Sequence, residues 1–206
     1  LFPHIQGRII IATFASNVHR LQQVLNAAHA NKRKVVITGR SMVNTINVAS
    51  EFGYISVPPN TLIEMDEMRQ YPDDRLVILC TGSQGEPLSA LARIANGEHK
   101  TIQIDEGDTV IISATPVPGN EKAVTRIVNQ LSKIGCDVWD KHRAMVHVSG
   151  HASAEELKLV LSIVQPKYFM PVHGESMHLR AHANLAQPRV LTRAISLCAK
   201  TAIRSR

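Results

Sequence analysis

The chain has 206 residues, of which 44% are hydrophobic and 19% are charged, proportions that are typical of a globular protein and exclude a disordered chain, a collagen or a long coiled coil. Five of the 23 basic residues lie in residues 188–206, which contain no acidic residue, and residues 1–187 contain the other 18 basic residues and all 17 acidic residues. The formal net charge of +6 therefore comes mostly from the end of the chain and gives little reason to infer nucleic-acid binding. No apolar run approaches the roughly 18 residues that a membrane-spanning helix requires, so no membrane partner is expected.

Short apolar runs, most of them rich in Ile and Val, predict six strands along the chain. They span residues 8–12, 34–38, 76–80, 109–113, 145–148 and 168–172. Most of these runs lack a period of two, which is typical of strands that are buried on both faces of a parallel sheet. Residues 54–74 contain three prolines, and we expect them to form a loop with a short helix rather than a domain linker.

Apolar residues at helical spacing lie between these strands. They predict helices over Val18–Ala28, Val124–Leu131 and Leu157–Val164. Ser153 and Glu156 fit a capping box that begins the last of these helices. The alternation of strands and helices predicts an α/β fold, with a mostly parallel sheet and helices on both of its faces.

Six loops follow the carboxyl ends of the predicted strands. They are residues 13–17, 38–41, 81–86, 114–120, 149–153 and 173–176, and five of them contain glycine. Small and hydroxyl side chains next to helix N-termini suit phosphate oxygens, but the same residues are ordinary turn and capping residues, so both interpretations stay open. Neither GxxxxGK[ST] nor a GxGxxG after the first strand is present, which argues against a nucleoside triphosphatase or a nicotinamide dehydrogenase.

Two histidines lie where predicted strands turn into loops. His151 follows the fifth predicted strand and His173 ends the sixth, so both are expected at the ligand-binding edge, where an imidazole can bind a metal or donate a proton. A metal site needs more ligands than these two. His147 lies within the fifth strand, where burial is the simpler explanation. His178 and His182 are expected on an exposed face of a last helix.

Cys80, Cys136 and Cys198 are far apart and odd in number, so they form neither a disulfide framework nor a paired metal knuckle. Free cysteines are typical of a reducing compartment, and we therefore expect a cytoplasmic location. The sequence begins at Leu1 without an initiator methionine or a secretory leader, which favours a piece of a longer protein.

Six motifs follow one another along the chain: GRIIIATFASNVHR, GRSM, LCTGSQGEP, PGNE, HVSGHA and PVHGE. In this order and spacing they closely resemble the ribonuclease J family, which belongs to the β-CASP branch of the metallo-β-lactamase-fold nucleases. The resemblance covers residues 1–187. It implies a Rossmann-like β-CASP domain over residues 1–152 and a short return segment of a metallo-β-lactamase core over residues 153–187. Residues 188–206 do not resemble the family and form an unassigned basic tail.

The resemblance also implies an activity. In this family two metal ions, usually zinc, activate a water molecule that attacks an RNA phosphodiester. The implied enzyme is an endonuclease and a 5′-to-3′ exonuclease in RNA processing, including that of rRNA, and in RNA decay. It prefers single-stranded RNA with a 5′ monophosphate and assembles as homodimers and tetramers.

Roles carry over to this chain residue by residue. By resemblance, His151 is the catalytic histidine and His173 is a metal ligand. The implied contacts to RNA phosphates are Ser16, Asn17, His147, Val148, Ser149, Gly150 and His151. The family's HxHxDH motif and its other metal ligands would lie upstream of Leu1, so we expect the chain alone to hold at most one metal ligand and to cleave no RNA.

Two alternatives use no family knowledge. The first is a non-catalytic α/β module that binds a nucleotide or a phosphorylated metabolite, and it predicts tight binding of mononucleotides. The second is a fragment that contributes only to oligomerisation.

Overall fold

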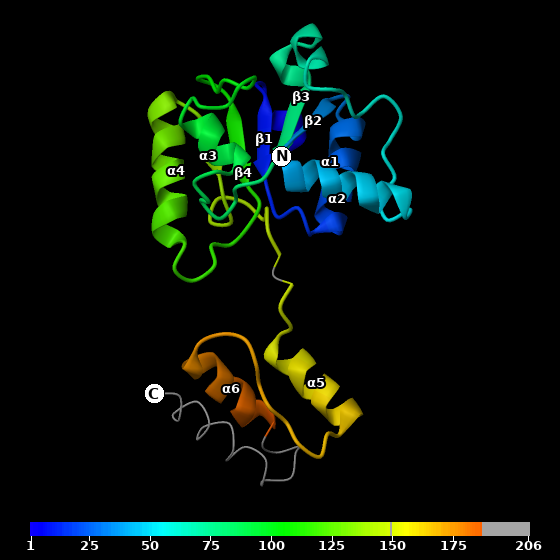
Figure 1. The fold of residues 1–206 in the computed structure, drawn as a ribbon, viewed down its shortest axis with the longest axis vertical. Coiled ribbons are helices and arrows are strands. Elements are labelled where there is room, and N and C mark those ends of the chain that lie inside the picture. Colours follow the sequence, from blue (N-terminus) through cyan, green and yellow to red (C-terminus); the bar gives the residue numbers. More distant parts are fainter. Residues whose placement is uncertain (149, 187–206) are drawn as a thin grey trace. The chain divides into compact units, whose positions relative to one another are not determined.

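The computed structural model describes residues 1–148 and 150–186 (Figure 1). The chain divides into two compact units, one formed by residues 1–148 and the other by residues from 149 onward. This division lies close to the domain boundary expected at residue 152, which stays a prediction. The expected basic tail, residues 188–206, lies outside the described residues.

The first unit contains a sheet of five parallel strands in the order β2-β3-β1-β4-β5. The strands are β1 (Ile9–Ala12), β2 (Lys34–Thr38), β3 (Leu76–Cys80), β4 (Thr109–Ile112) and β5 (Asp137–Trp139). The first four coincide with predicted strands, and every residue of β1, β3 and β4 is buried, as the absence of a period of two predicts. The sequence did not predict β5, because its three residues include two that are not aliphatic.

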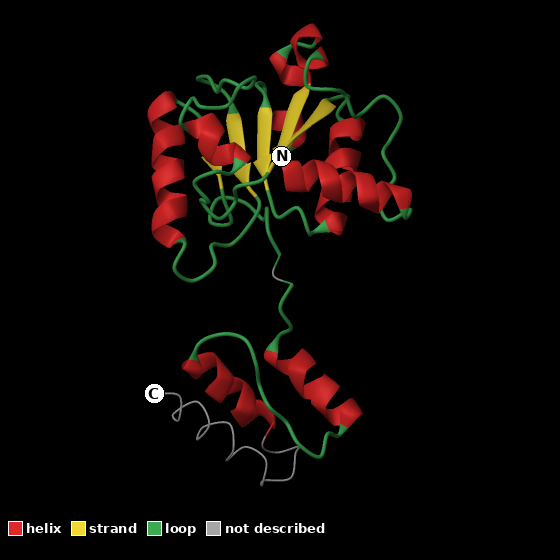
Figure 2. Ribbon diagram, viewed as in Figure 1, coloured by secondary structure: helices red, strands yellow, loops and turns green. Residues whose placement is uncertain are grey.

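Helices cover both faces of this sheet, which confirms the predicted α/β fold (Figure 2). The four helices of the first unit are α1 (Val18–Ala30), α2 (Arg40–Glu51), α3 (Ala90–Ala95) and α4 (Glu121–Ile134). α1 and α2 pack on one face, and α3 and α4 pack on the other (Figure 1). The remaining helical turns are the 3-10 helices η1 (Phe2–His4), η2 (Glu67–Gln70) and η3 (Asp73–Arg75), and the last two fulfil the prediction of a loop with a short helix.

Alternate residues of each strand enter the two halves of the core. In β1, Ile9 and Ile11 pack with Leu25 of α1, whereas Ile10 packs on the opposite face with Leu131 of α4. All five side chains are almost completely buried. Each contributes about 1.5–3 kcal/mol relative to an exposed position, so the two helical layers hold β1 at the centre of the sheet.

The two predicted strands at residues 145–148 and 168–172 are wrong, because neither segment forms a strand. A strand requires a neighbour to accept and donate its backbone hydrogen bonds. These segments pair with no strand among the described residues, and their apolar side chains are largely exposed, Met145 at 91% and Tyr168 at 68%.

The described part of the second unit, residues 150–186, contains two helices, α5 (Ala154–Val164) and α6 (Ser176–Ala186). α5 begins with the predicted capping box, in which the Ser153 hydroxyl accepts from the Glu156 amide and the Glu156 carboxylate accepts from the Ser153 amide. A small cluster of Leu161, Ala186 and Phe169 forms its core. Among the described residues of both units, no helix combines the length and apolar character needed to cross a bilayer.

Candidate functional site

The carboxyl edge of the sheet contains a topological switch point between β1 and β4. These neighbouring strands lead to helices on opposite faces, β1 to α1 and β4 to α4. Loops that diverge in this way open a crevice, and open α/β sheets bind their ligands there. Residues 13–17 and 113–120 border it.

Of the six predicted loops, four leave strands of this sheet at its carboxyl edge. The other two, residues 149–153 and 173–176, follow no strand and lie within the second unit. The expectation that all six share one sheet edge is therefore wrong.

Arg20 lies at this switch point, in the first turn of α1. Its Nη1 donates to the carbonyl oxygen of Ser113 at 2.7 Å and to Oγ1 of Thr13 at 3.1 Å. Its Nη2 donates to Nδ1 of His147 at 2.9 Å. Among the described residues, no carboxylate forms an ion pair with Arg20. Partial burial lowers the pKa of the guanidinium, but an arginine still keeps its charge at neutral pH. The positive charge of Arg20 therefore lies at the switch point, and neutral hydrogen-bond acceptors hold its guanidinium in position.

The contact with Arg20 fixes the tautomer of His147. A guanidinium has only donors, so Nδ1 of His147 must accept and, in the neutral ring, Nε2 carries the hydrogen. Partial burial lowers the pKa of His147, and the nearby charges of Arg20 and Lys141 lower it further, so the ring is neutral at pH 7. Its Nε2–H is thus a neutral donor beside the positive charge. The hydroxyl of Ser113 donates to the carbonyl oxygen of Val146 and holds this segment at the end of β4.

The predicted residues of the first loop lie at the same switch point, between β1 and α1. Ser16 is exposed, and Asn17 is half-buried because it caps α1, with Oδ1 accepting from the Arg20 amide at 3.1 Å. The cap fixes the start of α1, and with it the position of the Arg20 side chain. Val148 is exposed at 71%, and Ser149 lies outside the described residues.

The TGSQGE loop after β3 has a structural role. Gln84 is buried, its Nε2 donates to the carbonyl oxygen of Thr115 at 3.0 Å, and its Oε1 accepts from the Val117 amide at 2.7 Å. Gly85 has a φ of +75°, and a Cβ there would lie 2.6 Å from a backbone carbon of Ala123. This loop therefore needs its glycine for close packing against α4, and Gln84 ties it to the loop after β4.

The second unit brings His151 and His173 together. Their rings stack with centroids 5.9 Å apart and an interplanar angle of 14°. Both side chains are exposed, and so is Gly150. His173 has a φ of +70°, which non-glycine residues rarely adopt, and it directly precedes Gly174 in the turn that leads to α6. Neither histidine follows a strand, so their proximity comes from the loops before α5 and α6.

His178 and His182, expected on an exposed helix face, both lie on α6. His178 is exposed, and its Nδ1 accepts from the Glu175 amide. His182 is half-buried, with its ring edge-on to Phe169 at 4.9 Å, so the expectation is wrong for His182, which packs on the small core of the second unit.

The described residues do not complete a zinc site. Zinc sites in proteins use three or four histidine, cysteine or carboxylate ligands. Across residues 1–148 and 150–186, no group of three or more such side chains is placed to hold a metal ion. His151 and His173 provide two imidazoles, so this part of the chain by itself fits at most a portion of a metal centre.

The sequence reasoning missed Arg20 and Gln84 as site residues, although both lie inside quoted motifs. An arginine in the first turns of a helix has many ordinary explanations. Its partners Ser113 and His147 are 93 and 127 residues away, so no local pattern reveals the contact. A signal was nevertheless present, because Arg20 lies in the first turn of a helix that begins at the edge where open α/β sheets bind ligands.

Models of two protein families match the chain. One, described as ribonuclease J, beta-CASP domain, matches residues 6–131, which lie within the first unit. The other, described as Zn-dependent metallo-hydrolase RNA specificity domain, matches residues 141–191. The second range includes His147, His151 and His173.

Curated relatives match most of the chain. A ribonuclease J of Synechocystis is 47% identical over 188 residues, which are 91% of this chain and 29% of the relative. A ribonuclease J 1 of Streptococcus pyogenes is 48% identical over 182 residues, 88% of this chain and 32% of the relative. A ribonuclease J2 of Bacillus subtilis is 43% identical over 182 residues, which are 88% of this chain and 33% of the relative. The chain spans about a third of the length of these relatives.

Proposed function

This chain belongs to the ribonuclease J family, and from that premise we propose that its first unit binds the phosphate backbone of RNA for a metal-dependent ribonuclease. The family match favours this function over a separate module for nucleotides or metabolites. The activity proposed for the longer polypeptide is hydrolysis of RNA phosphodiesters, as an endonuclease and a 5′-to-3′ exonuclease that acts in RNA processing, including that of rRNA, and in RNA decay.

The observation that carries the proposal is the positive charge of Arg20 at the switch point. Neutral acceptors hold its guanidinium, and no ion pair with a carboxylate neutralises it among the described residues. A phosphate oxygen in the crevice would supply the missing negative charge, and the Nε2–H of His147 would donate to it. Ser16 and the exposed backbone around Asn17, at the start of α1, would contact the same strand of RNA.

The second unit is proposed to serve the chemistry. His151 would stabilise or protonate the scissile phosphate, and His173 would contribute one ligand to a metal centre that is completed by other residues. The proposed metal is zinc, two ions in the complete enzyme, where it would activate the attacking water. An added Cβ at Gly150 would meet no atom within 4 Å, so packing does not require glycine there and an RNA backbone has room to approach. Val148 and Ser149 are proposed to contact the RNA from the same segment.

Three finer properties belong to the same proposal. The preferred RNA is single-stranded with a 5′ monophosphate, and the complete protein assembles as homodimers or tetramers. Its location is the cytoplasm, which the free buried thiols of Cys80 and Cys136 support, because such thiols are typical of reducing compartments.

The test is RNA binding by this chain, measured by fluorescence anisotropy with a labelled ten-nucleotide RNA. His147→Asn keeps an acceptor near the position of Nδ1 for Arg20 but removes the Nε2 donor, whereas His147→Ala removes both. We expect both variants to bind about tenfold more weakly, since a hydrogen bond to a charged group is worth about 1.5–3 kcal/mol. His142→Ala, an exposed histidine in the same segment, is the matched control.

If His147→Asn binds RNA as tightly as the parent chain, His147 does not contact the phosphate. A cleavage assay tests the second unit: this chain with added zinc should cleave no RNA. Efficient cleavage that survives His151→Ala would overturn the role of His151.

A further inference from the structure

A cavity opens at the carboxyl edge of the sheet, at the ends of two strands other than β1 and β4. It has a volume of about 620 Å³ and lies at the ends of β2 and β3, between the start of α2 and the segment around α3. The residues that line it include two arginines, Arg40 and Arg93, and no acidic residue. This composition differs from that of the cavity beside β4, of about 420 Å³, whose lining includes Glu121 and Asp140.

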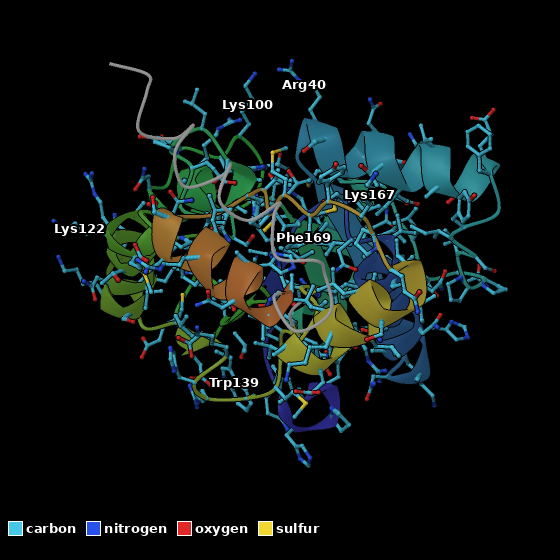
Figure 3. The ribbon with its side chains drawn as sticks, turned by 90° about the horizontal axis from the view of Figure 1, so that it is seen from below. Arg40, Lys100, Lys122, Trp139, Lys167 and Phe169 are labelled. Carbon is cyan, nitrogen blue, oxygen red and sulfur yellow. The ribbon has the colours of Figure 1, made fainter. Side chains whose placement is uncertain are left out.

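The two arginines are not neutralised within the described residues. Arg40 is exposed at the first position of α2, and it forms no ion pair there. Arg93 is half-buried, donates only weakly to the carbonyl oxygen of Glu98 at 3.4 Å, and also lacks a carboxylate partner. Lys100 projects from the same side of the first unit as Arg40 (Figure 3). The cavity therefore has a positive potential that an anion would relieve.

The wall of the cavity offers hydrogen-bond donors. Nδ1 of His99 accepts from the backbone amides of Thr101 at 3.3 Å and Ile102 at 3.1 Å, so in the neutral ring the hydrogen is on Nε2. This Nε2–H donates to Oγ1 of Thr38 at 3.0 Å, which leaves the Thr38 hydroxyl hydrogen free to donate into the cavity. Ser41 and Thr81 add two more hydroxyl groups to the lining.

The backbone at the start of α2 completes the wall. Gly39, which precedes the helix, has a φ of +101°, and a Cβ there would lie 2.8 Å from Oγ1 of Thr81. Glycine thus lets the loops after β2 and β3 approach each other closely. The first amides of α2, a helix of 12 residues, lack partners within the helix and add partial positive charge next to Arg40.

We propose that this cavity is a phosphate-binding site that is separate from the switch point. The ligand is a phosphate group, either a phosphodiester of an RNA strand that also occupies the switch point or the phosphate of a free phosphomonoester. The first source rests on the proposed function. The midpoint of β2 and β3 lies two strand spacings, about 10 Å, from the midpoint of β1 and β4, a span that a short RNA segment can cover.

The lining also predicts that the site does not discriminate between RNA sequences. It contains no phenylalanine, tyrosine or tryptophan side chain on which a base could stack. Contacts to phosphate alone carry no sequence information, so the site increases affinity for every RNA sequence by the same factor.

The test compares the double variant Arg40→Ala/Arg93→Ala with Arg69→Ala/Lys133→Ala, which removes the same charge from exposed positions in η2 and at the end of α4, near the amino edge of the sheet. Each chain is titrated with a ten-nucleotide oligouridylate, inorganic phosphate and adenosine 5′-monophosphate. Anisotropy reports RNA affinity, and NMR reports the ring resonance of His99, assigned from its loss in His99→Gln.

With an RNA phosphodiester as the ligand, the cavity variant binds oligouridylate about tenfold more weakly, whereas the control binds as the parent does. Its plot of log affinity against log salt also becomes shallower by about 0.7 for each lost contact. With a free phosphomonoester as the ligand, RNA affinity is unchanged, but phosphate or adenosine 5′-monophosphate moves the His99 resonance in the parent and not in the cavity variant.

The inference is overturned if the cavity variant binds RNA as the parent does and neither small phosphate moves the His99 resonance. The proposed RNA-binding function survives that result as long as the parent binds RNA. Conversely, a parent that binds no RNA but responds to phosphate at His99 refutes the proposed function and keeps the cavity as a phosphate site.

Discussion

A buried ion pair at the amino edge of the sheet offers a direct test of how the fold is held together. Arg8 precedes β1 and Asp108 precedes β4, and their side chains are only 9% and 5% exposed. Nε of Arg8 donates to Oδ1 of Asp108 at 2.9 Å and Nη2 donates to Oδ2 at 2.6 Å. This two-point contact raises the pKa of Arg8 despite burial, which alone would lower it.

The perturbation is Asp108→Ala. It leaves the buried guanidinium of Arg8 with the carbonyl oxygen of Gln103 and the carboxylates of Asp105 and Asp73. These two carboxylate side chains are 74% and 71% exposed and therefore screened by water. The substitution also removes the acceptor of the Asp105 amide. Removing one partner of a buried pair costs about 3–5 kcal/mol, because the other charge stays buried without compensation. Replacing both partners, Arg8→Met with Asp108→Leu, should cost much less, about 2 kcal/mol or below.

Urea unfolding monitored by the fluorescence of Trp139 measures the effect, since this single tryptophan lies in β5 of the first unit. With a denaturant slope of about 2 kcal/mol/M, the midpoint for Asp108→Ala should fall by about 1.5–2.5 M. A fall below about 0.5 M, or a double variant as unstable as the single one, would refute the reasoning.

Three further predictions use the same unfolding assay. Burial lowers the pKa values of both His147 and His99 from 6.5, so the stability that their neutral forms contribute is fully present above pH 6.5. The free energy of unfolding should therefore fall as the pH drops through the pKa values of the folded protein, and it should fall more steeply in the parent than in His99→Gln. Gly85→Ala should lower the free energy of unfolding by at least about 2 kcal/mol more than Gly97→Ala, because Gly97 has a similar φ but open space around it. Equal losses of stability in the two variants would show that backbone strain, and not close packing, determines the effect. Asn17→Ala should lose about 1 kcal/mol of stability and Asn17→Asp almost none, because the aspartate keeps the cap of α1; a neutral alanine would show that the cap is unimportant.

The central strands of the fold were predictable from local sequence. β1 and β3 are buried on both faces, so nearly every position is aliphatic and the run stands out from its surroundings. β5 has no such signature, because a short edge strand is defined by its pairing with β4 rather than by its own composition. The runs at 145–148 and 168–172 show the opposite error: their composition favours strands, but no described neighbour pairs with them.

The sequence predicted that His151 and His173 lie near each other, but it based this on two neighbouring strands that do not form. His151 and His173 both lie in turns that lead into helices of one small unit, and the structure places their ring centroids 5.9 Å apart. Arg20 differs, because its role depends on partners contributed by the end of β4 and by the segment after β5. A contact of this kind follows from the strand order of the sheet, which the sequence pattern does not specify.

The contrast between Arg8 and Arg20 gives the strongest physical reason to place function at the carboxyl edge. Both guanidinium groups are at least partly buried, but the pKa of Arg8 is raised by its contact with Asp108, whereas the pKa of Arg20 is lowered by burial. Asp108 neutralises Arg8 within the same sheet, whereas no carboxylate forms an ion pair with Arg20 among the described residues. Holding Arg20 with neutral acceptors alone sacrifices stability in the unliganded protein. Arg33 shares this feature at the amino edge, where backbone carbonyl oxygens of Ile5 and Gly7 accept from its guanidinium, so the arrangement alone does not indicate a ligand. Arg20 differs in its position, because it lies at the switch point, where open α/β sheets bind their ligands. For a positive charge flanked by the neutral donor of His147, the ligand that we propose is an anion.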